Sequence, residues 1–274
     1  MNDLSELSGM SHGPIELGLA MVEGCVSGEL KEAENPSEHF FADGLYGRAT
    51  TAQKDDVIVS QRHLKQHITV AIYGNCTVVD EQGNKTYVEA PGIWITEAGT
   101  IRSIYCHTDV KWLTVHANPK GISDVDEMEA EIAENPFTEY RKILEDQKDY
   151  PLMLDDIEFS AEEARAHSER EDDRVDVESK DFSVKPSIRE GLGLFAERAF
   201  EAGEFITDAR VGNLRTQAGR YTNHSKDPNG EFVLSQSGVE LVALKAIDPG
   251  EEITVNYRQA KEVAVAANRR FLWP

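Results

Sequence analysis

Three polar segments in the last third of the chain combine residue types that can bind a ligand and assist a reaction. The first contains Gly191-Leu192-Gly193, and glycines allow tight turns and a close approach of the backbone to a ligand. The second, residues 220–225, reads Arg-Tyr-Thr-Asn-His-Ser. The third, residues 248–257, is a turn that leads into a short strand ending at Tyr257. Taken singly, the first segment is typical of a hairpin turn, the second of a loop and the third of a strand entry.

Together, the order and spacing of these segments resemble the SET domain, the β-rich fold of S-adenosylmethionine-dependent protein-lysine methyltransferases. The matching residues are Gly191 to Phe195, Ala202 to Ile206, Arg220 to Ser225 with Pro228-Asn229, and Gly250 to Tyr257. The resemblance covers residues 180–260. It implies a transferase that uses S-adenosylmethionine as its cofactor and a protein with a target lysine as its partner.

The resemblance also implies a role for each matching residue. Backbone groups of Gly191-Leu192-Gly193 would approach the methionine part of the cofactor. Asn223 and His224 would bind the cofactor too, on a segment that passes beneath the chain holding Tyr257 and so forms a pseudoknot, against the usual rule for connections. Tyr257 would be the catalytic residue beside the methyl-transfer path. Arg220 would be structural or close to the cofactor.

Two departures from the family pattern concern the protein substrate. Only 30 positions separate Gly193 from Asn223, so the insert that shapes the substrate groove in most SET methyltransferases is nearly absent. Only 17 residues follow Tyr257, so a wall of the lysine channel must come from the last helix or from another chain. The sequence therefore indicates cofactor binding more directly than turnover, and it does not identify the substrate.

A second set of candidate residues lies in the N-terminal half. Residues 40–118 resemble a cupin-like β-barrel through Arg62 to His67, Gly74, Gly83, Ala90-Pro91, Gly99 and His116. Cupins often bind a metal through two histidines, a carboxylate and a later histidine. His63 and His67 are candidates for the first two ligands, since residues four apart on a strand share a face.

Arg102 stands where the later histidine of that metal motif is expected, and no convincing carboxylate fills its place. An arginine in the pocket disfavours a bound cation. Two alternatives therefore stay open, a metal-dependent enzyme and a metal-free structural or oligomerising barrel. His107 and His116 are expected to be surface or core residues, not ligands.

The order of a cupin-like barrel, an acidic helical spacer and a short SET domain also resembles proteins of tailed bacteriophages. This second resemblance implies a virion or assembly component in which both domains bind other proteins. The functional hypotheses are thus a protein-lysine methyltransferase, a virion protein and a metal-dependent cupin enzyme. A homo-oligomer is compatible with each of them.

The elements that must position these residues are mainly strands. Short β-branched runs separated by turn signals predict a sandwich or barrel, at residues 57–59, 68–73, 77–79, 86–88, 93–95, 101–105 and 112–115. Helical spacing or caps predict helices over 124–132, over 140–144, from Ser160 toward Glu171, and over 259–272. The predicted organisation is an N-terminal arm (1–39), a cupin-like barrel (40–119), an acidic helical spacer (120–180) and a SET-like domain with a C-terminal helix (181–274).

The charge of the chain is concentrated in one segment. The 274 residues include 50 acidic and 28 basic side chains, for a net charge of −22. Residues 121–180 alone hold 21 acidic and 7 basic side chains, whereas residues 181–274 hold 13 and 12. The total argues against strong binding of nucleic acid or of an anionic membrane. It leaves room for a local basic face formed by Arg189, Arg210, Arg215 and Arg220, and for a basic partner at the acidic spacer.

The remaining sequence features concern the compartment. The three cysteines are widely spaced and form no Cys-x-x-Cys pair, which favours a reducing environment. The chain has no run of 18 apolar residues, and its first residues have no basic region of the kind that begins a signal peptide. We therefore expect a cytoplasmic protein with no membrane partner.

Overall fold

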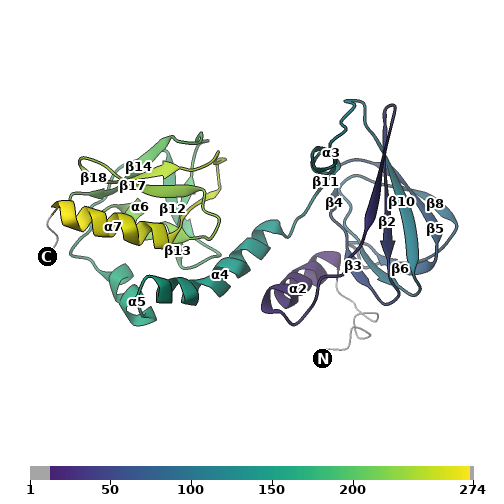
Figure 1. The fold of residues 1–274 in the computed structure, drawn as a ribbon, viewed down its shortest axis with the longest axis horizontal. Coiled ribbons are helices and arrows are strands. Elements are labelled where there is room, and N and C mark those ends of the chain that lie inside the picture. Colours follow the sequence, from purple (N-terminus) through teal and green to yellow (C-terminus); the bar gives the residue numbers. More distant parts are fainter. Residues whose placement is uncertain (1–12, 272–274) are drawn as a thin grey trace. The chain divides into compact units, whose positions relative to one another are not determined.

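A computed structural model describes residues 13–271, which divide into two compact units between Arg141 and Lys142 (Figure 1). Each unit is described by itself. The segment predicted as a spacer, residues 120–180, is divided between the two units, and the boundary lies within helix α4 (Thr138–Asp156).

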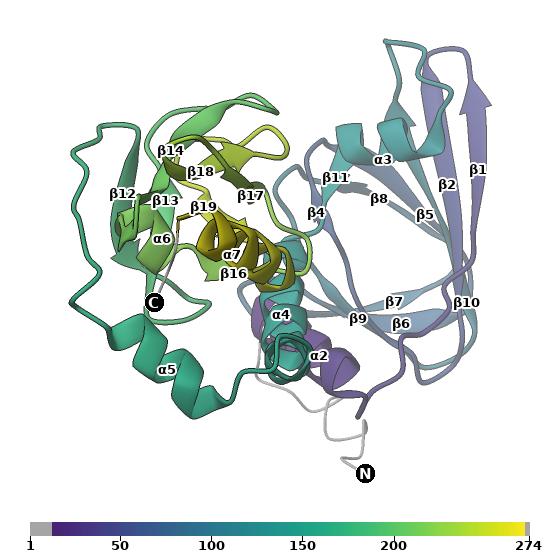
Figure 2. The same cartoon turned by 60° about the vertical axis from the view of Figure 1, so that its left-hand side comes forward.

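Two antiparallel sheets form the β-barrel of the N-terminal unit (Figure 2). One sheet has the strand order β1-β2-β10-β5-β8, with β1 Ser37–Ala42, β2 Leu45–Ala52, β5 His67–Tyr73, β8 Gly92–Thr96 and β10 Val110–Ala117. The other has the order β3-β9-β6-β7, with β3 Val57–Val59, β6 Asn75–Val79, β7 Lys85–Glu89 and β9 Ser103–Cys106. Each of the seven predicted β-branched runs lies in or overlaps one of these strands, so the predicted strand pattern is confirmed.

A short helix and a two-stranded ladder complete one end of the barrel. Helix α3 (Val125–Ile132) begins after Asp124, whose side chain accepts a hydrogen bond from the Glu127 amide at 2.9 Å. Met128 and Ile132 of this helix are fully buried beside Tyr46. The helix is followed by β11 (Ala133–Glu134), which pairs with β4 (Arg62–His63). The predicted helix over 124–132 is confirmed.

Helix α2 (Pro14–Ser27) occupies part of the segment that was predicted to be an arm. Proline at the first position starts the helix, and Gly28 ends it in the left-handed region with φ of 87°. Gly18 and Gly24 of this helix look like loop residues in the sequence, but both are needed for packing. A Cβ atom at Gly18 would overlap the Phe137 ring, and one at Gly24 would overlap Leu30. Residues 1–12 of the predicted arm lie outside the described residues.

The C-terminal unit consists of two small sheets. One has the order β12-β13-β19-β16, with β12 Phe182–Pro186, β13 Leu192–Ala196, β16 Asn223–His224 and β19 Glu252–Val255. The other has the order β15-β14-β18-β17, with β14 Phe205–Val211, β15 Leu214–Arg215, β17 Gly230–Leu234 and β18 Gly238–Ala243. Strand β16 pairs with β19 in parallel, so Asn223 lies opposite Thr254 and His224 opposite Val255. This pairing brings the second and third polar segments of the sequence together.

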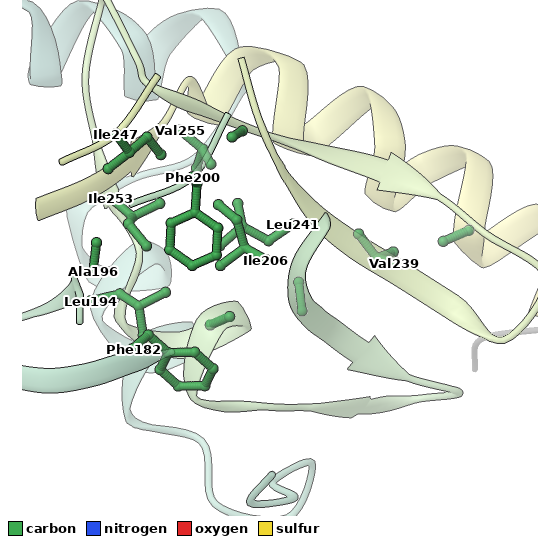
Figure 3. Close-up of a cluster of buried hydrophobic side chains, with 14 residues drawn as sticks. Phe182, Leu194, Ala196, Phe200, Ile206, Val239, Leu241, Ile247, Ile253 and Val255 are labelled. Atoms are coloured by element: carbon green, nitrogen blue, oxygen red, sulfur yellow. The ribbon is translucent and has the colours of Figure 1, made fainter. Parts of the chain in front are cut away.

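One apolar cluster forms the core between these two sheets (Figure 3). The ring of Phe200 lies among Leu194 and Ile253 from the first sheet and Ile206 and Leu241 from the second. None of these five side chains is more than 4% exposed. The core therefore fixes the positions of β13 and β19, whose ends carry the candidate residues.

Two helices of this unit match the predictions, whereas α4 is much longer than the predicted helix over 140–144 and α6 was not predicted. Helix α5 (Ala161–Glu169) begins with the predicted capping box, in which Ser160 and Glu163 exchange hydrogen bonds. Helix α6 (Gln217–Tyr221) is a short turn before β16, and α7 (Tyr257–Phe271) corresponds to the predicted last helix. Among the described residues, no helix is both long and apolar enough to span a membrane.

A buried ion pair attaches the end of the acidic segment to the C-terminal unit. Arg215 donates to both carboxylate oxygens of Asp173, from Nε at 2.7 Å and from Nη2 at 2.9 Å. The two residues are 2% and 6% exposed. Residues 169–174 look like a linker in sequence, yet two contacts fix them to β15. One is the ion pair with Arg215, and the other is a hydrogen bond from the Val175 amide to the Arg215 carbonyl.

We expect Asp173→Ala to lower the free energy of unfolding by about 3 kcal/mol, because it leaves a buried guanidinium without its carboxylate. Chemical denaturation followed by circular dichroism measures this effect. The matched control is Asp172→Ala, which removes an exposed neighbour and should change the stability by less than about 0.5 kcal/mol. Equal effects of the two variants would contradict a stabilising role of the buried pair between Asp173 and Arg215.

Candidate functional site

The glycine-containing loop lies at the start of strand β13. The Ser187 amide donates to the Gly191 carbonyl at 3.0 Å, which closes the turn. Gly191 has φ of 48°, and the space where its Cβ would lie is open. A Cβ atom at Gly193 would instead overlap the carboxylate of Glu252. The two glycines are therefore required for different reasons, one for the turn and one for close packing.

Asn223 fastens the glycine loop to strand β16. Its amide nitrogen Nδ2 donates to the backbone carbonyls of Glu190 at 3.1 Å and Leu192 at 3.3 Å. The same nitrogen lies 2.7 Å from Oε1 of Glu252. The sequence assigned Gly191-Leu192-Gly193 and Asn223 to one site, and the structure brings them together.

Glu252 is a central residue of the site that the sequence interpretation did not assign. Its carboxylate accepts hydrogen bonds from Asn223 and from the Ser187 hydroxyl, the latter at 2.8 Å. Arg189 Nε lies 3.6 Å from its second oxygen. The signal was present, because Glu252 belongs to the matching Gly250 to Tyr257 segment. Its function became visible only once the loop and β19 were placed side by side.

His224 positions the backbone at Tyr257. The ring nitrogen Nδ1 accepts a hydrogen bond from the Tyr257 amide at 3.2 Å, so the proton of the neutral imidazole must be on Nε2. Nε2 in turn lies 3.3 Å from Asp149 Oδ2. Burial lowers the pKa of His224 even though Asp149 opposes this shift, which favours the neutral ring.

Tyr257 is the first residue of helix α7, and its side chain returns toward β16. Its hydroxyl donates to the Thr222 carbonyl at 3.0 Å, and its ring centroid lies 5.3 Å from that of His224. Burial raises the pKa of Tyr257, and the nearby Tyr150, Glu252 and Glu190 raise it further. The phenol is therefore protonated at neutral pH and acts as a hydrogen-bond donor.

Helix α4 contributes two buried carboxylates to this site from the segment that was predicted to be a spacer. Asp146 pairs with Arg189 and accepts the Lys226 amide at 2.7 Å. Asp149 binds His224 and also accepts from Arg258 Nη1 at 2.7 Å. Both carboxylates lie on the same stripe of the helix because their spacing of three residues is close to one turn.

The sequence interpretation missed these two aspartates because the segment was classified by its charge. The signal that could have found them is periodicity. Ile143, Asp146, Asp149 and Met153 follow one another at spacings of three and four, and all four are buried. An acidic residue within an otherwise apolar stripe indicates a carboxylate with a buried partner.

Three of the four arginines expected to form a local basic face are paired with carboxylates of the acidic segment. Arg189 pairs with Asp146, Arg215 with Asp173, and Arg220 Nη2 with Asp176 Oδ1 at 2.5 Å. Arg220 also lies over the ring of its neighbour Tyr221. The expected basic face is therefore largely neutralised.

The barrel histidines also meet, although not in the way the sequence suggested. His63 and His67 lie on two different strands, β4 and β5, and their ring centroids are 4.5 Å apart. His116 of β10 stacks on His67 at 4.2 Å and is 1% exposed, so it is a core residue. Within residues 13–271, no group of three or more His, Cys, Asp or Glu side chains has the arrangement needed to hold a metal ion.

One family model matches part of the C-terminal unit. Residues 207–258 match the family model of the SET domain. The match contains Asn223, His224, Glu252 and Tyr257 and begins after the glycine loop. The C-terminal part of this chain thus contains a SET domain, and the predicted fold class, mainly β with helices, is confirmed.

Solved structures similar to part of this chain include several cupins. A cupin superfamily protein from Desulfitobacterium hafniense is 11% identical, with 32% of this chain and 81% of that chain covered and a TM-score of 0.28. A cupin 2 conserved barrel domain protein from Salinispora arenicola is 10% identical, with 36% and 87% covered and a TM-score of 0.29. A search of curated proteins finds no match to the sequence.

The ion pair between Asp149 and Arg258 predicts a pH-dependent stability. Hydrogen bonds from Arg258 hold the pKa of Asp149 below its usual value, so its contribution is present above about pH 4 and is lost as the pH falls further. We expect Asp149→Asn to cost about 2 kcal/mol at pH 7 and much less at low pH. Urea unfolding at both pH values measures the difference. The exposed Asp155→Asn serves as control, and a cost of Asp149→Asn that does not change with pH would refute the prediction.

Proposed function

We propose that the C-terminal unit is a protein-lysine methyltransferase that uses S-adenosylmethionine. The observation that carries the proposal is the joining of the three polar segments by side-chain hydrogen bonds. Asn223 holds the glycine loop, and His224 holds the backbone of Tyr257. The SET domain match over residues 207–258 supports the same reaction class.

The residues present fit the proposed cofactor. Open space beside Gly191 lets a ligand approach the backbone of the loop. The amide nitrogen of Asn223 is used by the loop carbonyls and Glu252, so its side-chain oxygen is the atom that would accept a hydrogen bond from a ligand. Gly191-Leu192-Gly193 and Asn223 would hold the methionine part of S-adenosylmethionine, whose ammonium group is a hydrogen-bond donor.

The reaction requires little more than alignment and a neutral amine. When bound, S-adenosylmethionine would supply an electrophilic methyl group for transfer to the lysine nitrogen. The Tyr257 hydroxyl donates a hydrogen bond to the Thr222 carbonyl. Its oxygen therefore keeps lone pairs that can accept a hydrogen bond from an N–H of the incoming amine. Burial lowers the pKa of a lysine and so favours the neutral nucleophile.

Helix α4 would supply part of the substrate wall that the short insert does not. Tyr150 of this helix is close enough to raise the pKa of Tyr257 and is 39% exposed. An exposed aromatic side chain beside the catalytic phenol suits the apolar stem of a lysine. The protein partner, a cytoplasmic location and the absence of strong nucleic-acid binding stay predictions. The virion hypothesis finds no support in the comparisons.

Calorimetric titration with S-adenosylmethionine tests the binding step. We expect the wild-type chain to bind and Asn223→Ala to bind at least about tenfold more weakly, because it loses the contacts that shape the loop. Asn213→Ala, which changes an exposed asparagine of the same unit, should bind like the wild type. Absence of binding to the wild-type chain would overturn the proposal.

A labelled-methyl assay on cell lysate tests the transfer step separately. We expect Tyr257→Phe to keep its affinity for S-adenosylmethionine and to lose about 100-fold or more in transfer rate, because the phenol that orients the amine is gone. Transfer at the wild-type rate by this variant would remove Tyr257 from the reaction. Binding without any transfer by the wild-type chain would reduce the unit to a cofactor-binding module.

A further inference from the structure

Along the five-stranded sheet of the N-terminal unit, many polar side chains face the barrel interior and several large apolar side chains face outward. In strand β5, His67, Thr69 and Ala71 are buried whereas Ile68 and Ile72 are exposed. In β8, Ile93 is 75% exposed and Thr96 is 1% exposed. A sheet that stabilises a fold normally shows the opposite pattern. A polar interior is typical of a barrel that encloses a ligand.

This interior contains a cavity of about 370 Å³, within the range of small-molecule sites. Its lining includes the rings of Trp94 and Trp112, the hydroxyl groups of Thr69 and Thr96, and several aliphatic side chains of the second sheet. A cavity of this kind offers apolar contact for the body of a ligand and a few polar groups to orient it.

The lining of the cavity includes three cationic side chains, Arg48, Arg102 and Lys111, and no carboxylate. Arg48 pairs with Glu129 at 3.2 Å, and Lys111 pairs with Glu38 at 2.7 Å. Among the side chains that the structure describes, no carboxylate forms an ion pair with Arg102, although Asp80 is near enough to raise its pKa. The Nη1 atom of Arg102 donates to Thr96 Oγ1 at 3.3 Å. Arg102 is thus an arginine with donor capacity left over, inside a chain of net charge −22.

The neighbouring histidines add polar atoms but no positive charge. Burial, the neighbouring His67 and the charges of Arg48 and Arg102 together lower the pKa of His63 to about 4. His67 is shifted in the same direction by the same kinds of neighbour. His63 is 9% exposed, and its Nδ1 atom is buried without a hydrogen-bond partner in the described part of the chain. The positive charges of Arg48 and Arg102 beside these rings favour an anion over a metal cation.

We propose that this cavity binds a small organic carboxylate, with its charged end on Arg102 and its apolar body against Trp94 and Trp112. Arginine suits this role because its planar fork of donors matches the two oxygens of a carboxylate. His63 also lines the cavity and adds a polar ring to its wall. The binding requires no metal and is independent of the proposed methyl transfer.

The experiment uses the full chain and three probe pairs, benzoate, phenylacetate and 1-naphthoate, each compared with its neutral amide. Because Trp94 and Trp112 line the cavity, tryptophan fluorescence reports occupancy, and calorimetry gives the affinity. We expect at least one carboxylate to bind at millimolar concentration or below, its amide to bind about tenfold more weakly or not at all, and a chelator to leave the binding unchanged.

Arg102→Gln should weaken the binding of the carboxylate about tenfold and leave the binding of the amide unchanged. The matched control is Arg165→Gln, whose side chain is 80% exposed on α5. Circular dichroism confirms that each variant is folded, and the comparison of acid with amide in the wild-type chain stands without any variant. Failure of all three carboxylates to bind, equal binding of acid and amide, or loss of binding upon chelation would each overturn the proposal.

Discussion

The candidate site of the C-terminal unit depends on one network of ion pairs and hydrogen bonds between helix α4 and the ends of β13, β16 and β19. Asp146 holds Arg189, and Arg189 faces Glu252, which in turn holds Asn223. All three charged side chains are about 10% exposed or less, so removing one partner leaves another buried without compensation. This constraint makes α4 part of the site and not merely a connection.

The same network changes the meaning of the acidity of the chain. Charge counted along the sequence describes residues 121–180 as a solvated spacer with a large negative excess. In the structure, Asp146, Asp149, Asp173 and Asp176 of that stretch face arginines or a histidine of the C-terminal unit. Part of the excess negative charge therefore compensates cations that would otherwise be buried alone, and the remainder lies on exposed surfaces.

The N-terminal unit depends on a different constraint, the inverted polarity of its larger sheet. Because side chains alternate along a strand, the pairing of β10 with β2 and β5 sends Arg48, Thr114 and Thr69 to the same side. The second sheet covers that side and encloses a cavity. The barrel thus encloses polar groups at a cost in packing, and the proposed ligand gives those groups a partner.

The local elements were largely predictable from the sequence. Strands followed from β-branched runs, α3 from apolar residues at spacings of three and four, and α5 from the Ser160 and Glu163 capping box, because each of these signals acts over a few residues. Helix α2 was missed because Gly18 and Gly24 look like loop residues until Phe137 and Leu30 are placed against them. These contacts join a glycine to a residue far along the chain or beyond the end of the helix, so no local sequence pattern predicts them.

The residue types at the candidate site can be read from the order of Gly191-Leu192-Gly193, Asn223-His224 and Tyr257 along the chain. How these residues meet depends on the folded structure. The parallel pairing of β16 with β19 and the docking of α4 place Glu252, Asp146 and Asp149 among them. The folded structure also decided that His63, His67 and His116, on three strands, share one interior. The physical reason is that these carboxylates and rings become partners only when burial removes the water that would otherwise solvate them.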